Sequence, residues 1–132
     1  MKRGPVLATI FILACTMCAT VDAQGRRTQT PGGVDLVEVV GCLTPGANST
    51  WQLMNGSDPV VTRSASTSPE AIKAAETKAL GKQRYALIGM SSFEPAPHQG
   101  HKMVVRGLLV KDTKETRINV TSFQMAAVAC AN

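Results

Sequence analysis

Short runs of apolar and β-branched residues follow position 33, and alternation within such a run, with a period of two, is typical of a β-strand. The clearest run is 101–110, where Met103, Val105 and Leu109 fall on one side, so we expect that side to enter a core. The pair Asn55-Gly56 is typical of a turn between strands. The predicted strands are 34–43, 49–54, 84–89, 101–110 and 117–125, with a short extended piece at 60–62.

The last predicted strand contains a change of parity. Ile118 and Val120 share one face, whereas Phe123 and Met125 share the other. An extra residue near Thr121 would bring all four apolar side chains to the same face, so we predict a β-bulge at 121–122.

One segment has helical signals instead. Ser68 is a suitable N-cap, followed by Pro69 at the first helical position and Glu70 in the first turn. Gly81 comes directly after Leu80, where a C-terminal cap belongs. The apolar stripe between these ends is narrow, so we expect a surface helix with one face against the sheet.

These elements predict a mainly β domain, a small five- to six-stranded antiparallel barrel with one surface helix. Classical OB barrels carry their helix between the third and fourth strands, whereas here it falls between the second and third. A small β-sandwich is therefore the alternative architecture.

The N-terminal segment is predicted to be an export signal. Lys2 and Arg3 precede an apolar run at 6–18, which is shorter than the roughly 20 residues that a membrane-spanning helix needs. Small residues around Ala23 suit a signal peptidase. We expect a signal peptide at 1–23, a flexible leader at 24–33 and the folded domain at 34–132, exported to the periplasm or secreted.

A lipoprotein signal is the alternative. Residues 12–15 end in Cys15 and loosely match a bacterial lipobox, in which the cysteine is lipidated. Acyl chains would then anchor the domain to a membrane. In either case the signal and the composition are typical of a bacterial chain.

The four cysteines divide into two pairs. Cys15 and Cys18 lie within the predicted signal, so Cys42 and Cys130 remain, one near each end of the domain. Thiols in an oxidising compartment usually pair, and we predict a disulfide between these two. Two independent buried thiols are the alternative.

Charge disfavours one class of partner. The chain has 14 Lys and Arg against 9 Asp and Glu, a net charge of +5, but these residues are dispersed along it. Proteins that bind nucleic acid more often gather their cations on one face or stripe. We therefore do not expect a nucleic-acid partner.

Several short motifs resemble a known family. They are Gly41-Cys42-Leu43, Tyr85-x-Leu87-x-Gly89, Gly100-His101-Lys102-Met103-x-Val105-x-Gly107-x-Leu109, Val120-Thr121-Ser122 and the late Cys130. Together they resemble small secreted bacterial OB-like domains of unknown function and are more distantly similar to periplasmic bacterial OB-fold stress proteins. The resemblance implies an OB-like barrel outside the cytoplasm, and it implies no catalytic residues.

An OB-like barrel would bind sugars or oligonucleotides through aromatic platforms. Trp51 is the main candidate, with a positive charge supplied by Arg63, Arg84 or Lys102. A tryptophan that belongs to the core is the alternative.

His98 and His101, with Glu94 nearby, form the candidate metal site, because imidazole and carboxylate groups are transition-metal ligands. The alternative is a backbone-bonded His101 and a solvated His98.

Catalysis has little support in the sequence. The chain lacks a G-x-S-x-G nucleophile elbow and a glycine-rich phosphate loop, and we expect neither an enzyme nor a cofactor. The predicted function is an exported, non-enzymatic binding or envelope-associated module for an unknown small ligand or envelope component. The alternative is a periplasmic metal-handling or stress-related protein that uses His98 and His101.

Overall fold

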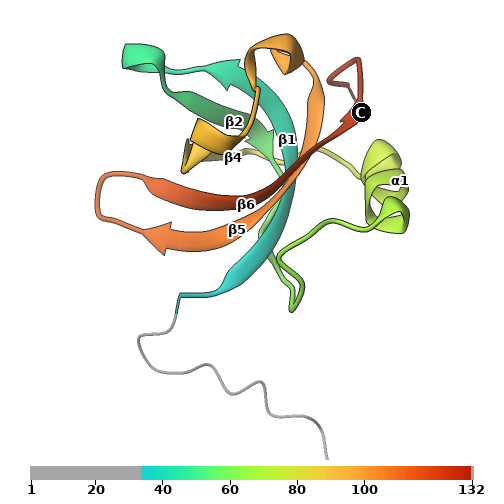
Figure 1. The fold of residues 1–132 in the computed structure, drawn as a ribbon, viewed down its shortest axis with the longest axis horizontal. Coiled ribbons are helices and arrows are strands. Elements are labelled where there is room, and N and C mark those ends of the chain that lie inside the picture. The colour runs from blue at the N-terminus through green and yellow to red at the C-terminus, as the bar shows by residue number, and fades with distance from the viewer. Residues whose placement is uncertain (1–33, 132) are drawn as a thin grey trace, which may run out of the picture. The chain divides into compact units, whose positions relative to one another are not determined.

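The computed structural model describes residues 34–131, so the predicted signal peptide, leader and lipidation site at Cys15 lie outside the described residues. The described residues form six strands, one α-helix and three short 3-10 turns (Figure 1). The predicted mainly β domain with one helix is confirmed. The elements are β1 (Leu36–Pro45), η1 (Ala47–Ser49), β2 (Trp51–Gly56), β3 (Val60–Val61), α1 (Pro69–Thr77), β4 (Gln83–Ile88), η2 (Met90–Ser92), η3 (Ala96–His98), β5 (Lys102–Lys111) and β6 (Thr116–Ala127).

The strands form one sheet in the order β2-β4-β6-β5-β1-β3, and β1 also pairs with β2. The pairings of five strands therefore form a closed circuit. The strands pair antiparallel, as predicted, except for β4 and β6, which run parallel, and the antiparallel prediction is corrected there. The chain reverses direction between β4 and β5 and again between β5 and β6, so β6 runs in the same direction as β4. Because β6 and β4 are neighbours in the sheet, they pair as parallel strands.

The predicted bulge is present. Arg106 lies opposite Ser122 and Gly107 lies opposite Val120, which leaves Thr121 as the extra residue on β6. The bulge brings Val120 and the later Phe123 into one core, as expected. The expectation that Met125 is buried is wrong: it keeps the register of Phe123, opposite Met103, but lies near the end of β6 and is 38% exposed.

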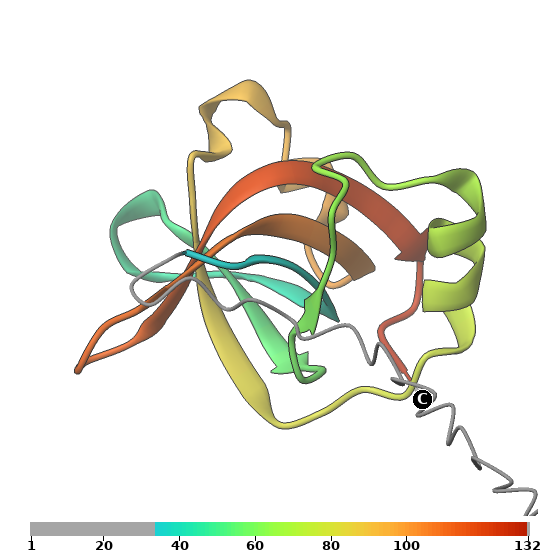
Figure 2. The ribbon, with the colours of Figure 1, turned by 90° about the horizontal axis from the view of Figure 1, so that it is seen from below.

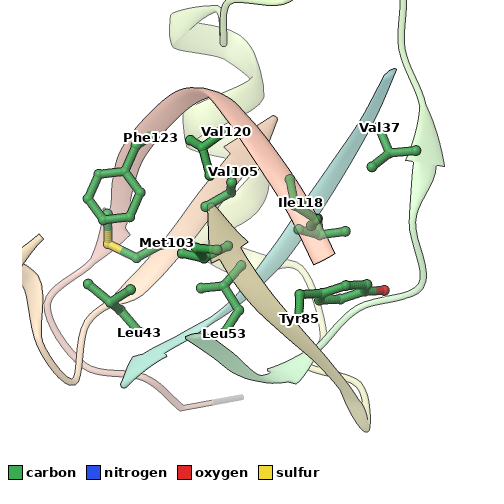
Figure 3. Packing of buried hydrophobic residues seen from close by; sticks show 11 residues of the cluster. Val37, Leu43, Leu53, Tyr85, Met103, Val105, Ile118, Val120 and Phe123 are labelled. Atoms are coloured by element: carbon green, nitrogen blue, oxygen red, sulfur yellow. The ribbon is translucent and has the colours of Figure 1, made fainter. Parts of the chain in front are cut away.

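Two apolar clusters stabilise the fold. The main core lies inside the strand circuit, where side chains from five strands point toward one another (Figure 3). A smaller core contains Val40 and Val104 on the outer face of the sheet, covered by Ala75 of α1. Strands β1 and β5 are therefore buried on both faces, although alternation predicted one buried face for β5. The main core contains Val37, Val39, Leu43, Leu53, Tyr85, Leu87, Met103, Val105, Ile118, Val120 and Phe123.

Helix α1 begins where predicted and ends early. The Ser68 side chain accepts a hydrogen bond from the first turn, as an N-cap does. The last helical residue is Thr77, because Lys78 is extended. Gly81 is not the helix cap; it lies against the Gly56 carbonyl, so closely that a Cβ would overlap that oxygen.

Buried Tyr85 predicts a pH dependence of stability. It is 2% exposed and its hydroxyl donates to the Ser57 carbonyl at 2.8 Å. Burial, with the negative charge of Asp58 as a smaller cause, raises its pKa from 10 to about 12. The folded protein holds this proton more tightly than the unfolded chain does. The contribution of protonated Tyr85 to the free energy of unfolding is therefore fully present below pH 10 and is lost as the pH rises from there to about 12.

Urea unfolding at increasing pH should show this decline, and Tyr85→Phe should flatten it. Because the chain has one tyrosine, the ultraviolet absorbance of tyrosinate reports this group alone. A native-state titration midpoint near pH 10, the ordinary value, would contradict the prediction.

Candidate ligand-binding site

A pocket of about 410 Å³ lies across β2 and β4. The loop between β1 and β2 and the turn between β5 and β6 complete its wall. The side chains able to contact a polar ligand are Thr50, Trp51, Gln52, Arg84, Lys114, Glu115 and Thr116.

Strand alternation explains the polar floor of this pocket. Leu53 and Tyr85 lie opposite each other and belong to the main core. Their neighbours Gln52 and Ala86, which are also opposite each other, therefore face outward, as does Arg84. The small side chain of Ala86 leaves room between the longer side chains at its sides.

The loop between β1 and β2 is held in a compact shape. Asn48 and Ser49 have positive φ angles of 53° and 59°, a conformation that turns the chain back within a few residues. The Thr50 hydroxyl donates to the Ala47 carbonyl at 2.6 Å, and the Gly46 amide donates to the Thr50 carbonyl at 2.8 Å. These bonds give the pocket a preformed wall on this side.

The turn between β5 and β6 is fixed by Asp112. Its carboxylate accepts hydrogen bonds from the amide of Thr113 at 2.6 Å and from the hydroxyl of the same residue at 3.1 Å. These bonds, the amide bond foremost, lower the pKa of Asp112. The Asp112 amide donates to the Glu115 carbonyl at 3.1 Å and closes the turn. Lys114 and Glu115 are thereby placed at the pocket.

The charged groups of the pocket have no partners of their own. Arg84, Lys114 and Glu115 are exposed, and none of the three side chains has an ion pair or hydrogen bond to any residue within 34–131. Two cations against one carboxylate leave an excess of positive charge. The arrangement favours a ligand that carries negative charge together with hydroxyl groups.

Trp51 combines both alternatives considered for it. It is half-buried and packs against the main core, and it also lines the pocket. Contact with the core restrains the ring. By the same alternation Trp51 lies on the core side with Leu53, opposite Leu87, so it borders the pocket rather than forming its floor.

The structure brings two of the predicted ligand residues together, Trp51 and Arg84. Arg63 is exposed in the connection between β3 and α1 and is not among the residues that line the pocket. The sequence did not indicate Lys114 and Glu115, because their turn is remote in the chain from Trp51 and Arg84. A charged turn was the only signal that these residues carried.

Lys102 is 1% exposed and lies away from the pocket. Its ammonium group donates to the carbonyls of Glu76 at 3.0 Å and Lys78 at 2.6 Å. These carbonyls lie at the C-terminal end of α1, where the helix dipole favours a cation. In the structure, Lys102 therefore joins the helix to β5.

The predicted metal-site residues are only partly together. The Nδ1 atoms of His98 and His101 lie 3.4 Å apart, and both side chains are half-buried. Glu94 is exposed and does not complete the pair: within residues 34–131 no three His, Cys, Asp or Glu side chains are grouped so that they could hold one metal ion.

No protein family, curated protein or solved structure matches this chain. Within the part of the chain that the structure describes, no helix is long and apolar enough to cross a bilayer.

Proposed function

We propose that this chain is an exported OB-like binding module that holds its ligand in the pocket across β2 and β4 without transforming it. OB folds bind ligands on the face of their second and third strands and on the loops that join strands 1–2 and 4–5. If the two-residue β3 is not counted, β2 and β4 are the second and third strands of the circuit. The pocket then occupies the position of an OB ligand site, and this observation carries the proposal.

The closed circuit of five strands supports the OB-like barrel, because closure is the property that distinguishes a barrel from an open sheet. The disulfide between Cys42 and Cys130 supports export, since disulfides persist mainly in oxidising compartments. The predicted signal peptide agrees with the same compartment.

The chemistry of the pocket favours an acidic saccharide of the cell envelope as the ligand. Its volume of about 410 Å³ lies within the range usual for sites that take small molecules. Arg84 and Lys114 suit carboxylate or sulfate groups, whereas Glu115 and Gln52 suit sugar hydroxyls. A nucleic acid is less suitable, because Trp51 is the one aromatic residue that lines the pocket and single strands need several stacking platforms.

Substitution of Arg84 tests this proposal. The intrinsic fluorescence of the chain's single tryptophan, Trp51, should change on addition of oligogalacturonides. Arg84→Gln should weaken binding by roughly 10- to 100-fold, the value of one charge-assisted hydrogen bond. Because Arg84 is exposed and unpaired, the melting temperature should stay the same.

Arg63→Gln is the matched control, an exposed arginine outside the pocket, and it should bind like the wild type. Neutral galactose oligomers should bind more weakly than the acidic ones. Recovery of the saccharide unchanged after incubation tests the absence of catalysis. Equal losses in the two arginine variants, or no response to any acidic saccharide, would contradict the proposal.

A further inference from the structure

The connection between β4 and β5 brings together the only two histidines of the chain. The rings of His98 and His101 have centroids 5.5 Å apart and meet edge to face. Their Nδ1 atoms face each other at 3.4 Å. Neither histidine lines the ligand pocket described above, so the pair needs an explanation of its own.

The separation of these nitrogens matches one coordination geometry. Two nitrogen ligands about 2.0–2.1 Å from a tetrahedral ion lie about 3.3–3.4 Å apart. The same ligands at a right angle would lie about 2.9 Å apart, and in a linear arrangement about 4.1 Å. The observed 3.4 Å fits the tetrahedral case, which Zn²⁺ prefers.

The backbone holds both histidines in place. The Gly100 amide donates to the Leu43 carbonyl at 2.8 Å, and the Leu43 amide donates to the His101 carbonyl at 3.0 Å. The φ angle of Gly100 is 82°, in the left-handed region that favours glycine. Strand β1 thus fixes the loop at the two residues that precede β5.

The His98 ring is held by the main core. It packs edge to face on Phe123, with ring centroids 5.9 Å apart, and Phe123 in turn packs against Phe93. Phe123 is 8% exposed and belongs to the main core. A ligand pair restrained in this way loses little freedom when it binds an ion, and this preorganisation favours affinity.

We propose that His98 and His101 bind one Zn²⁺ ion through their two Nδ1 atoms, at a site separate from the ligand pocket. Water fills the remaining coordination positions, because no third protein ligand joins the pair among residues 34–131. In the bound state both rings carry their proton on Nε2. In the metal-free state one Nδ1–H donates to the other Nδ1, so the ion replaces a hydrogen bond that already aligns the two rings.

Titration of the untagged, ¹⁵N-labelled protein with zinc chloride tests the site. Every imidazole resonance comes from this pair, since the chain has no other histidine. The Nδ1 resonances of both rings should shift together and saturate at one ion per chain. His98→Gln and His101→Gln should each lower zinc affinity at least tenfold.

Two controls separate this site from weaker binding elsewhere. Glu94→Gln removes a nearby carboxylate and should leave zinc affinity unchanged. Arg84→Gln alters the ligand pocket and should also leave it unchanged, so the two proposals fail independently. The proposal is overturned if the wild-type resonances stay in place at millimolar zinc. Retention of wild-type affinity by the folded His98→Gln or His101→Gln variant, checked by its amide spectrum, would also overturn it.

Discussion

Replacing both Cys42 and Cys130 by alanine is expected to lower the free energy of unfolding by about 4–5 kcal/mol. The disulfide joins β1 to the segment after β6 and spans a sequence separation of 88 residues. Such a long crosslink removes much of the conformational freedom of the unfolded chain. Small domains have net stabilities of about 5–15 kcal/mol, so this loss would remove a large part of the total.

Urea unfolding of the wild type with and without reductant measures the same quantity in a second way. Reductant should lower the wild-type midpoint to that of the double alanine variant and should leave the variant unaffected. Intact mass should show the wild type two hydrogens lighter than its reduced form. If reductant leaves the wild-type midpoint where it was, the disulfide does not stabilise the domain.

Local patterns in the sequence predicted most of the elements. Apolar runs bounded by turn residues, with alternation at 101–110, identified the strands, and Ser68 before Pro69 identified the start of α1, because each signal depends on residues that are close together in the chain. The bulge at Thr121 was also predictable, since the apolar parity changes there and a strand has a strict period of two.

Features that depend on distant neighbours were not predictable. Val104 and Lys102 alternate with core residues and were expected on the open face of β5, but α1 and its C-terminal end cover both. The parallel pairing of β4 and β6 likewise depends on which strands become neighbours. No local pattern of residues carries that information.

The residues of the candidate pocket likewise divide into those that the sequence indicated and those that only the pairing of distant strands brings there. Trp51 and Arg84 could be named from their residue types alone, but so were Arg63 and Lys102, which do not line the pocket. Lys114 and Glu115 reach the pocket because β6, beginning at Thr116, lies alongside β4. Their place in the pocket therefore depends on the pairing of β4 with β6, which the sequence did not reveal.

The ion pair of Arg106 with Glu38 has a structural role comparable to the disulfide. Arg106 on β5 lies opposite Glu38 on β1, and its Nε and Nη2 donate to one carboxylate oxygen at 2.7 Å and 2.6 Å. The Arg106 Nη1 also donates to the carbonyls of Ser64 and Ser66. These two residues belong to the connection from β3 to α1, which passes over β5 and β6 (Figure 2).

Burial makes this pair sensitive to the loss of one partner. The side chains of Arg106 and Glu38 are 11% and 18% exposed. Removal of the arginine would leave a largely buried carboxylate without its cation, and two backbone carbonyls would lose their donor. Breaking a buried pair in this way typically costs about 3–5 kcal/mol, whereas replacing both partners by apolar residues costs much less.

Arg106→Met is therefore expected to lower the free energy of unfolding by about 3–5 kcal/mol, and Glu38→Leu together with Arg106→Met should recover part of that loss. Arg117→Met is the matched control, because Arg117 and Asp112 form an ion pair whose side chains are 35% and 45% exposed. That variant should cost less than about 1 kcal/mol. Urea unfolding gives these values, and limited proteolysis should show earlier cleavage at 62–67 in Arg106→Met. Equal costs for the two arginine variants would mean that burial does not strengthen the Arg106 pair.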